Sequence, residues 1–237
     1  MARTVNILGI TLARGGSKTV PRKNIRPLNG KPLLAYTIEV ALKSQMLTNY
    51  VVSSDDAEIL RIAIAHGAST TSRPSYLAED NTPHLPALLH ALYAAEERWD
   101  VRYDIVADIR CTNPLKNVGD IDGAIKTLIA TGAECVAGVS PGPYLERLKR
   151  IVYDDHDIPR LVDVETEPES GQRQDLVAAT FIRNGSIYVA TVEHLRSGKY
   201  FVGVPVVPWI MPKMRSINID DWVDFWAAGA VLENMDG

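Results

Sequence analysis

Apolar and polar residues follow two different periods along this chain. Four apolar runs rich in β-branched residues predict strands, at residues 5–13, 50–53, 104–109 and 134–139. Between these runs, apolar residues recur at the spacing that marks one face of a helix. This second period predicts helices at residues 32–46, 56–66, 83–99 and 118–131. Strands that alternate with helices in this way predict βαβ units and a mostly parallel sheet.

The pattern changes after Ser140. Residues 147–153 form a basic stretch with strand character, whereas the acidic residues 154–169 follow neither period. We interpret residues 141–180 as an arm for dimerisation or substrate binding, within a single domain that spans residues 1–237. Beyond the arm, the pattern predicts a strand at 186–190, a helix at 192–196, a strand at 204–207 and a last helix at 221–233.

The composition indicates one globular core. The chain is 46% hydrophobic and 23% charged over 237 residues, which suffices for a sizeable interior. The apolar run at residues 5–13 is much shorter than the ~20 residues that span a bilayer. It continues into a charged, glycine-rich loop, so we interpret it as a strand and expect neither a membrane segment nor a secretory signal. Cys111 and Cys135 lack metal-ligand spacing, which favours a reducing, cytoplasmic setting.

Charge is distributed unevenly along the chain. The net charge of -4 predicts no general affinity for nucleic acid or membranes. The first 38 residues nevertheless lack Asp and Glu and carry only positive charges: Arg3, Arg14, Lys18, Arg22, Lys23, Arg26 and Lys31. We therefore expect an anionic ligand near this part of the chain.

Most of these cations lie in the sequence LARGGSKTVPRKN at residues 12–24, where the first predicted strand ends. Adjacent glycines allow positive φ and leave room for backbone N–H groups to approach phosphate oxygens. Arg14, Lys18 and Lys23 can neutralise a triphosphate and a departing pyrophosphate. The glycine patterns of P-loops and of dinucleotide-binding loops are both absent, and the competing interpretation is a solvated basic turn.

Further short motifs follow in order: VSSD at 52–55, SRP at 72–74, LAED at 77–80, TNPL at 112–115, RNGSIYV at 183–189 and SINID at 216–220. Together with ARGGSK at 13–18 and the PRKN element that ends at Asn24, they resemble the acylneuraminate cytidylyltransferases, or CMP-sialic acid synthetases, over nearly the whole chain. The resemblance implies an α/β, three-layer, Rossmann-like nucleotidyltransferase fold. It also implies a homodimer that transfers a cytidylyl group from CTP to an acidic keto sugar and releases pyrophosphate.

The resemblance assigns roles to individual residues. The catalytic cations that contact the triphosphate would be Arg14, Lys18 and Lys23. The nucleotide would be bound by Ala13, Gly15, Gly16, Ser17, Asn24, Ser54, Arg73 and His84. The acid sugar would be bound by Arg110, Thr112, Asn113, Lys149, Arg173, Gln174, Asn184 and Gly185. Without the resemblance, Arg73 would be interpreted as a surface cation, and Asn184 with Gly185 as a turn before a strand.

Three positions depart from the family's pattern. The family ends with two aspartates two residues apart that hold Mg²⁺ against the phosphates, and this chain has Asn218 and Asp220 there. We expect Asp220 to be the main metal ligand and Asp221 to cap the last helix. The family's Gln is Arg110 here, and a Ser of the family aligns with His84. An added cation at Arg110 is expected to favour an extra anionic group on the acceptor.

These departures leave other interpretations open. The nearest is the same transfer to another acceptor: legionaminic or pseudaminic acid, an eight-carbon ulosonic acid or a non-sugar anion. The other is a catalytically silent nucleotide-binding module, because Asn218 brings no charge to the metal. Neither Ser17 nor Cys111 has the base partner that a nucleophile needs. We therefore expect direct in-line attack on the α-phosphorus of CTP, with Mg²⁺ and without an organic cofactor.

Overall fold

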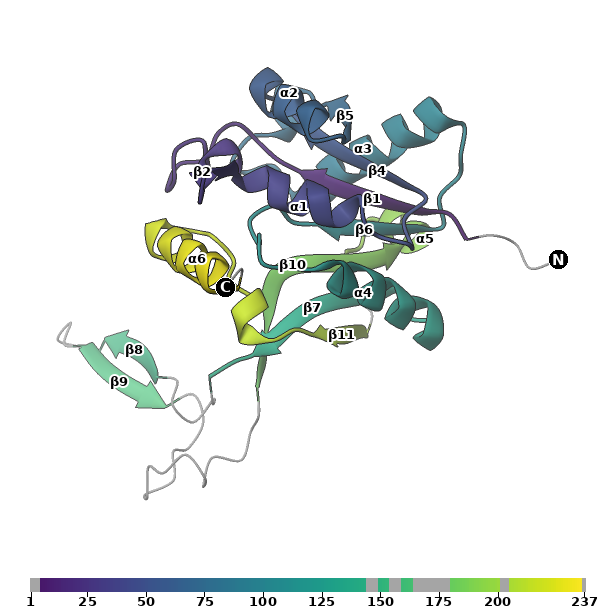
Figure 1. The fold of residues 1–237 in the computed structure, drawn as a ribbon. Helices are drawn as coiled ribbons and strands as arrows, with labels where there is room; N and C mark the ends of the chain where they lie inside the picture. The colour runs from purple at the N-terminus through teal and green to yellow at the C-terminus, as the bar shows by residue number, and fades with distance from the viewer. Residues whose placement is uncertain (1–4, 144–148, 154–158, 164–179, 201–204, 236–237) are drawn as a thin grey trace.

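A seven-stranded sheet forms the centre of the molecule (Figure 1). The computed structural model describes residues 5–143, 149–153, 159–163, 180–200 and 205–235. In spatial order the strands are β11 (Val206–Ile210), β7 (Cys135–Pro141), β10 (Phe181–Thr191), β6 (Ile105–Ile109), β1 (Ile7–Leu12), β4 (Asn49–Ser54) and β5 (Ser69–Ser72). Within this sheet β10 is antiparallel to both of its neighbours, and the other paired strands are parallel. The prediction of a mostly parallel α/β sheet is confirmed.

Helices cover both faces of the sheet. They are α1 (Leu33–Ala41), α2 (Ala57–Ala65), α3 (His84–Trp99), α4 (Val118–Thr131), α5 (Val192–Arg196) and α6 (Trp222–Met235). One buried apolar cluster joins α1, α2 and α4 to one face, and a second joins α3 and α5 to the other. Alternate residues of β1 serve the two clusters, since Ile7 belongs to the first and Leu8 to the second. This is the expected three-layer arrangement.

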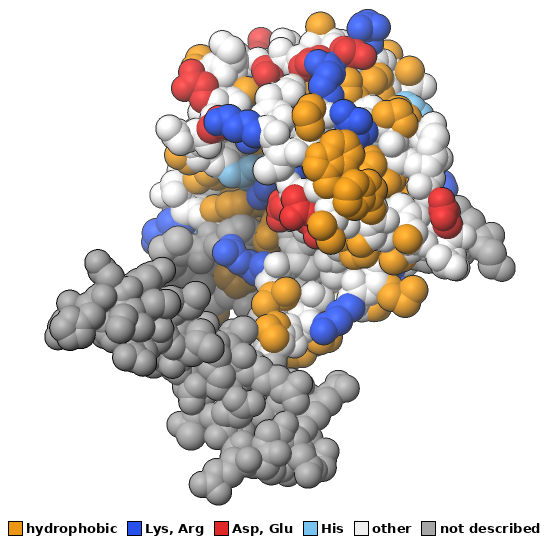
Figure 2. All heavy atoms as spheres, turned by 90° about the vertical axis from the view of Figure 1, so that its left-hand side faces the viewer, with side chains coloured by type: hydrophobic (Ala, Val, Ile, Leu, Met, Phe, Trp, Pro, Cys, Tyr) orange, Lys and Arg blue, Asp and Glu red, His pale blue; other side chains and the backbone are white. Residues whose placement is uncertain are grey.

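A third apolar cluster attaches α6 to the beginning of the chain. Val20 and Leu28 pack there against Ile219, Phe225 and other residues that precede or belong to α6. The opposite side of α6 remains exposed, and Figure 2 shows hydrophobic side chains gathered on this face of the molecule. None of the helices in the described ranges is both long enough and apolar enough to cross a membrane.

Smaller elements complete the described part of the chain. β2 (Pro27–Leu28) and β3 (Lys31–Pro32) form a short hairpin, and β8 (Lys149–Tyr153) pairs antiparallel with β9 (Pro159–Asp163). Short 3-10 helices lie at Lys23–Ile25, Ser75–Leu77 and Lys213–Arg215. The basic stretch is a strand as predicted, but the acidic segment contains β9, where we expected no regular structure. Backbone pairing with β8 stabilises a strand that its own sequence pattern does not reveal.

The helix ends largely follow their sequence signals. Asp56 caps α2 by accepting hydrogen bonds from the backbone N–H groups of Glu58 and Ile59. Gly67 and Gly132 adopt positive φ just after α2 and α4. The prediction for α1 was too long, because the chain leaves the helix after Ala41 and continues in turns.

Two strands of the second half also differ from prediction. β10 begins at Phe181, five residues before the expected start, and its pairing with β7 shifts register between Arg183 and Tyr188. Gly185 lies inside this irregularity with φ of 63°, so it forms a bulge rather than the turn that opens a strand. β11 continues past Val207 through Pro208, which an edge strand tolerates because one side of its backbone needs no partner.

Candidate functional site

The candidate site lies at the carboxyl ends of three neighbouring parallel strands. The loop at residues 13–24 follows β1, Asp55 and Asp56 follow β4, and residues 110–113 follow β6. Loops at this edge of an open parallel sheet are the usual place for ligands in α/β proteins. The strands therefore bring together three motifs that are far apart in the sequence.

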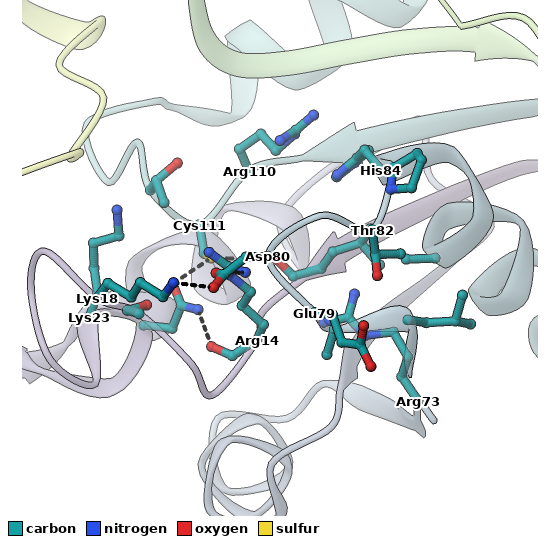
Figure 3. A pocket seen from close by; sticks show the side chains of 18 of the residues that line it. Arg14, Lys18, Lys23, Arg73, Glu79, Asp80, Thr82, His84, Arg110 and Cys111 are labelled. Atoms are coloured by element: carbon teal, nitrogen blue, oxygen red, sulfur yellow. Dashed lines mark hydrogen bonds and ion pairs between the residues drawn. The ribbon is translucent and has the colours of Figure 1, made fainter. Parts of the chain in front are cut away.

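A pocket of about 370 Å³ opens at this edge, and we term it the cationic pocket. Arg14, Lys18 and Lys23 reach it from the first loop, and Arg73 reaches it from the segment after β5 (Figure 3). Its lining also includes Ser17, Asn24, Asp80, Thr82, His84, Arg110 and Thr112. The predicted gathering of the loop cations in one pocket is thus seen in the structure.

Asp80 of the LAED motif lies between two of these cations in the cationic pocket. Its two carboxylate oxygens form ion pairs with Arg14 and Lys18, at 2.8 and 2.5 Å (Figure 3). Hydrogen bonds from Lys18 and Arg14 hold the pKa of Asp80 below its usual range. Asp80 is therefore an ionised carboxylate held between two cations of the first loop.

The first loop is fixed by contacts to its own fold. Asn24 is buried and donates a hydrogen bond to the backbone carbonyl of Arg14, at 2.8 Å. Gly15 packs so closely on Asp56 that a Cβ there would lie 2.8 Å from a carboxylate oxygen. Neither Gly15 nor Gly16 adopts the positive φ that we expected. Glycine is required at position 15 for close approach, and Gly16 faces open space.

Arg73 is a buried cation and not the surface residue of the competing interpretation. It is 6% exposed, its guanidinium lies 3.6 Å from Asp55, and its Nε has no hydrogen-bond partner within the described ranges. Burial lowers the pKa of Arg73 from its ordinary value, partly offset by Asp55. A buried guanidinium with an unused donor next to a pocket is well placed to bind an acceptor group of a ligand.

A second pocket of about 740 Å³ lies beside the first, and we term it the tyrosine pocket. It is lined by Ile182, Arg183, Gly185, Tyr188, Tyr200, Asn218 and Asp220, together with His84, Arg110 and Thr112. The last three residues line both pockets and therefore mark the boundary between them. Two ligands bound side by side would meet at this boundary.

Asp108, near the end of β6, is a buried carboxylate beneath the boundary. Its Oδ2 accepts hydrogen bonds from His84 Nε2, Arg110 Nε and Tyr200 OH, at 2.9, 2.8 and 2.6 Å. Burial alone would raise the pKa of Asp108, but Arg110 and His84 outweigh it and hold the pKa well below its usual range. Arg110 is thus paired with a carboxylate. The expected preference for an extra anionic group on the acceptor stays a prediction.

The SINID segment lies against the first loop. Lys23 Nζ donates to the backbone carbonyl of Ile219, and Thr19 Oγ1 donates to that of Asp220. The two predicted metal positions are adjacent, since Asn218 Nδ2 donates to Asp220 Oδ2 at 2.8 Å, while Asn218 Oδ1 accepts from Thr112 at 2.7 Å. Asp221 caps α6 as predicted, through the backbone N–H groups of residues 223 and 224.

The absence of a side chain at Gly185 leaves room for Asn218 beside the β10 bulge. A Cβ at this position would lie 3.0 Å from Asn218 Oδ1, and its positive φ is unfavourable for other residues. Gly185 lines the tyrosine pocket, and its role toward an acid sugar stays a prediction.

Several predicted contact residues do not face either pocket. The side chains of Ala13, Ser54, Asn113 and Asn184 are buried in the protein. Ser54 Oγ accepts a hydrogen bond from the backbone N–H of Asp56, and Asn184 Nδ2 donates to Ser216. These residues shape the loops around the site, and Gly16 likewise is absent from both linings. Lys149 begins β8, but its side chain, like Arg173 and Gln174, lies outside the described residues.

Other residues at the site were missed by sequence reasoning. Asp80 belongs to the LAED motif, but it was assigned no role from the sequence. Tyr200 belongs to none of the motifs. Lys116 is buried beneath the loop after β6, where its Nζ donates to the backbone carbonyl of Arg110, at 2.6 Å, and to Thr37 Oγ1. Its position directly after TNPL is the only signal that the sequence carried.

Comparison with known proteins now decides the family. A sequence profile for the family described as Cytidylyltransferase matches residues 8–181. This chain belongs to the cytidylyltransferase family. The matched residues include β1 from Leu8 onward, the first loop, the LAED and TNPL motifs and Asp108, and they contain every residue that lines the cationic pocket.

Two relatives place this cytidylyltransferase more closely. The N-acylneuraminate cytidylyltransferase of Escherichia coli O18:K1:H7 is 32% identical over 92% of this chain, which spans half the length of that relative. The CMP-N,N'-diacetyllegionaminic acid synthase of Legionella pneumophila is also 32% identical and is matched over 94% of both chains. The resemblance drawn from the sequence motifs is confirmed.

Solved structures support the fold. CMP:2-keto-3-deoxy-manno-octonic acid synthetase in complex with CTP has a TM-score of 0.72 to this cytidylyltransferase, covering 97% of this chain and 99% of that one. The two sequences are 14% identical, so this likeness shows the fold alone.

Proposed function

We propose that this cytidylyltransferase transfers a cytidylyl group from CTP to an acidic keto sugar of the sialic acid type, and releases pyrophosphate. The observation that carries the proposal is the pair of adjoining pockets with His84, Arg110 and Thr112 on their boundary. The cationic pocket suits a triphosphate because Arg14, Lys18 and Lys23 come together there. The tyrosine pocket offers aromatic, amide and hydroxyl groups of the kind that bind a sugar.

In the proposed reaction, a hydroxyl of the sugar attacks the α-phosphorus of CTP in line with the departing pyrophosphate. The adjoining pockets would hold the two substrates in contact, which replaces a bimolecular encounter by a positioned reaction. Arg14, Lys18 and Lys23 would stabilise the charge that develops on pyrophosphate. Asp80 must give up its ion pairs with Arg14 and Lys18 before these cations can contact phosphate.

We also propose Mg²⁺ as the cofactor, with Asp220 as its main protein ligand. Asp220 is exposed in the tyrosine pocket and its neighbour Asn218 lies within hydrogen-bond distance. One or two carboxylates combined with substrate phosphates and water suffice for Mg²⁺ in many nucleotide enzymes. The described residues contain no group of three or more His, Cys, Asp or Glu arranged for a metal, so the phosphates would supply the remaining ligands. Bound there, Mg²⁺ would offset phosphate charge.

The assembly and the setting are proposals as well. We propose a homodimer in which residues 141–180 contact the partner, and a cytoplasmic location in keeping with the two buried, unpaired cysteines. Light scattering at micromolar concentration should give the mass of two chains. A monomeric mass together with full activity would contradict the dimer.

The identity of the acceptor has a nearest alternative. A pseudaminic acid cytidylyltransferase of Campylobacter jejuni is 39% identical over 52% of this chain, so related nine-carbon acids are also candidates. Eight-carbon ulosonic acids and non-sugar anions complete the set that the sequence left open. Because Asp108 neutralises Arg110, we give less weight to an acceptor with an additional anionic group.

A panel of acceptors tests the proposal. The full chain is incubated with CTP, Mg²⁺ and each acid sugar in turn, and pyrophosphate release is measured together with the mass of the CMP product. We expect turnover with at least one nine-carbon keto acid and none with UTP in place of CTP. CTP binding without turnover on any acceptor would support the silent nucleotide-binding module instead.

A further inference from the structure

The boundary between the two pockets carries a group that can accept a proton. Of the three residues that line both pockets, Arg110 stays protonated and is paired with Asp108. Thr112 donates its hydroxyl proton to Asn218 at 2.7 Å. His84 is the remaining one, and an imidazole can bind or release a proton near neutral pH.

The surroundings of His84 fix which ring nitrogen is free. Burial raises the pKa of Asp108, but the Arg110 guanidinium that donates to it counteracts burial and favours the ionised form, and an ionised carboxylate only accepts hydrogen bonds. His84 Nε2, which lies 2.9 Å from Asp108 Oδ2, must therefore carry a proton. In the neutral ring the lone pair is then on Nδ1, and no described residue forms a hydrogen bond with that atom. The side chain is 28% exposed, so a ligand can reach it.

The orientation of the ring is held from two directions. Tyr200 stacks on the His84 ring with centroids 5.8 Å apart and 16° between the planes, and its hydroxyl donates to the same oxygen of Asp108. Arg110 donates to that oxygen too and lies over the ring of Tyr188, which packs edge-on against Tyr200. Asp108, Arg110 and Tyr200 are thus the charged and titratable groups that face His84, and Figure 3 shows His84 and Arg110 on the same side of the pocket.

We propose that His84 is the general base of the transfer reaction and that Asp108 is its positioning residue. This inference rests on the proposed function. Nδ1 takes the proton from the attacking hydroxyl of the sugar while the oxygen forms a bond to the α-phosphorus of CTP. The bond from that phosphorus to the bridging oxygen breaks, and its electron pair leaves with pyrophosphate. Asp108 stabilises the imidazolium that forms, and the proton passes from Nδ1 to solvent.

The Asp80 carboxylate is less suited to this task. Asp80 is paired with Arg14 and Lys18, which lower its pKa and make it a weak base. It also lines only the cationic pocket, whereas the attacking hydroxyl must reach the boundary. A positioned base with a pKa near the working pH contributes roughly 10²- to 10⁴-fold to rate.

The test compares wild type with His84→Asn, which keeps a polar side chain but cannot take the proton. The acceptor is one that the wild-type protein uses, and kcat, the dissociation constant of CTP and the melting temperature are measured for both. We expect kcat to fall by roughly 10²- to 10⁴-fold, with a much smaller loss of CTP affinity because His84 also lines the cationic pocket, while the melting temperature reports whether the variant stays folded. Added imidazole should restore part of the rate to His84→Gly, and Tyr200→Phe should lower kcat by less than His84→Asn.

The dependence of kcat on pH separates a base from a phosphate-binding cation. A base is active when neutral, so the wild-type rate should fall as pH is lowered, and this fall should be missing in His84→Asn. A wild-type rate that instead falls as pH rises, with this fall missing in His84→Asn, would assign His84 to phosphate binding and overturn the inference. An unchanged kcat in His84→Asn would also overturn the inference. The proposed function would still stand in that case, because the wild-type protein turns over CTP and the acceptor. If the wild-type protein used no acceptor at all, both would be wrong.

Discussion

Removing the cations of the first loop should weaken catalysis by an amount that the structure bounds. A hydrogen bond to a charged group contributes roughly 1.5–3 kcal/mol, and about 1.4 kcal/mol corresponds to tenfold in rate. A full phosphate contact therefore predicts a loss of about 10- to 150-fold in kcat/KM for CTP. Arg14 and Lys18 are the two variants to test, each changed to Ala.

Two observations place the expected loss in the lower part of that range. Both cations are already bonded to Asp80, so a phosphate replaces an existing ion pair rather than water alone. The Lys18 side chain is also 79% exposed, and solvent screens its charge. We expect a loss of about 10- to 50-fold for Arg14→Ala and about tenfold for Lys18→Ala.

The assay is the initial rate of pyrophosphate release at varied CTP and saturating acceptor. Lys43→Ala is a matched control, because Lys43 is an exposed cation beyond the end of α1 and lies in neither pocket lining. It should behave like wild type. Wild-type kinetics in both loop variants would show that the first loop is not part of the site. An equal loss in Lys43→Ala would show that the effect comes from the net charge of the protein and not from contacts in the pocket.

Three further predictions concern neighbouring residues. Asp80→Asn should lower KM for CTP by a few fold, because the amide competes less well with phosphate for Arg14 and Lys18; a raised KM in a titration of rate against CTP would mean that Asp80 itself helps to bind the nucleotide. Asp220→Asn should nearly abolish turnover in a Mg²⁺ titration, whereas Asn218→Asp should be tolerated and tighten Mg²⁺ binding; wild-type rates in Asp220→Asn at limiting Mg²⁺ would move the metal to another carboxylate. Gly185→Ala should lower stability by about 1 kcal/mol, because the position has positive φ and faces Asn218; an unchanged melting temperature would show that the bulge can relax.

The sequence predicted those parts of the fold in which local pattern and packing agree. Strands buried on both faces, such as β1 and β6, have continuous apolar runs that identify them directly. β5 was missed because its sequence, STTS, is polar, and it is a strand only through its pairing with β4 at the edge of the sheet. β9 was missed because its pairing with β8, rather than a period in its own sequence, makes it a strand.

The motifs predicted where the site lies in the fold better than they predicted which side chains face its pockets. Asn184 and Ser54 belong to motifs that surround the pockets, yet their side chains hold backbone groups of their own loops. Arg73 has the opposite outcome, since the sequence alone favours a surface cation and the fold buries it beside the cationic pocket. Which atom faces a ligand depends on tertiary packing that a motif does not encode. The contact of Asp108 with Tyr200, which are 92 residues apart, is of this kind.

The attachment of the SINID segment to the first loop has a consequence for synthesis of the protein. Lys23 and Thr19 bond to backbone carbonyls 196 and 201 residues further along the chain. Contacts of such long sequence separation cost loop-closure entropy, and they cannot form until residues 219 and 220 have been synthesised. A ribosome that has translated as far as α4 has already produced every cation of the first loop, but not the segment that these residues hold. A nascent chain therefore carries the positive charges of the first loop long before it can complete the contacts that hold this loop.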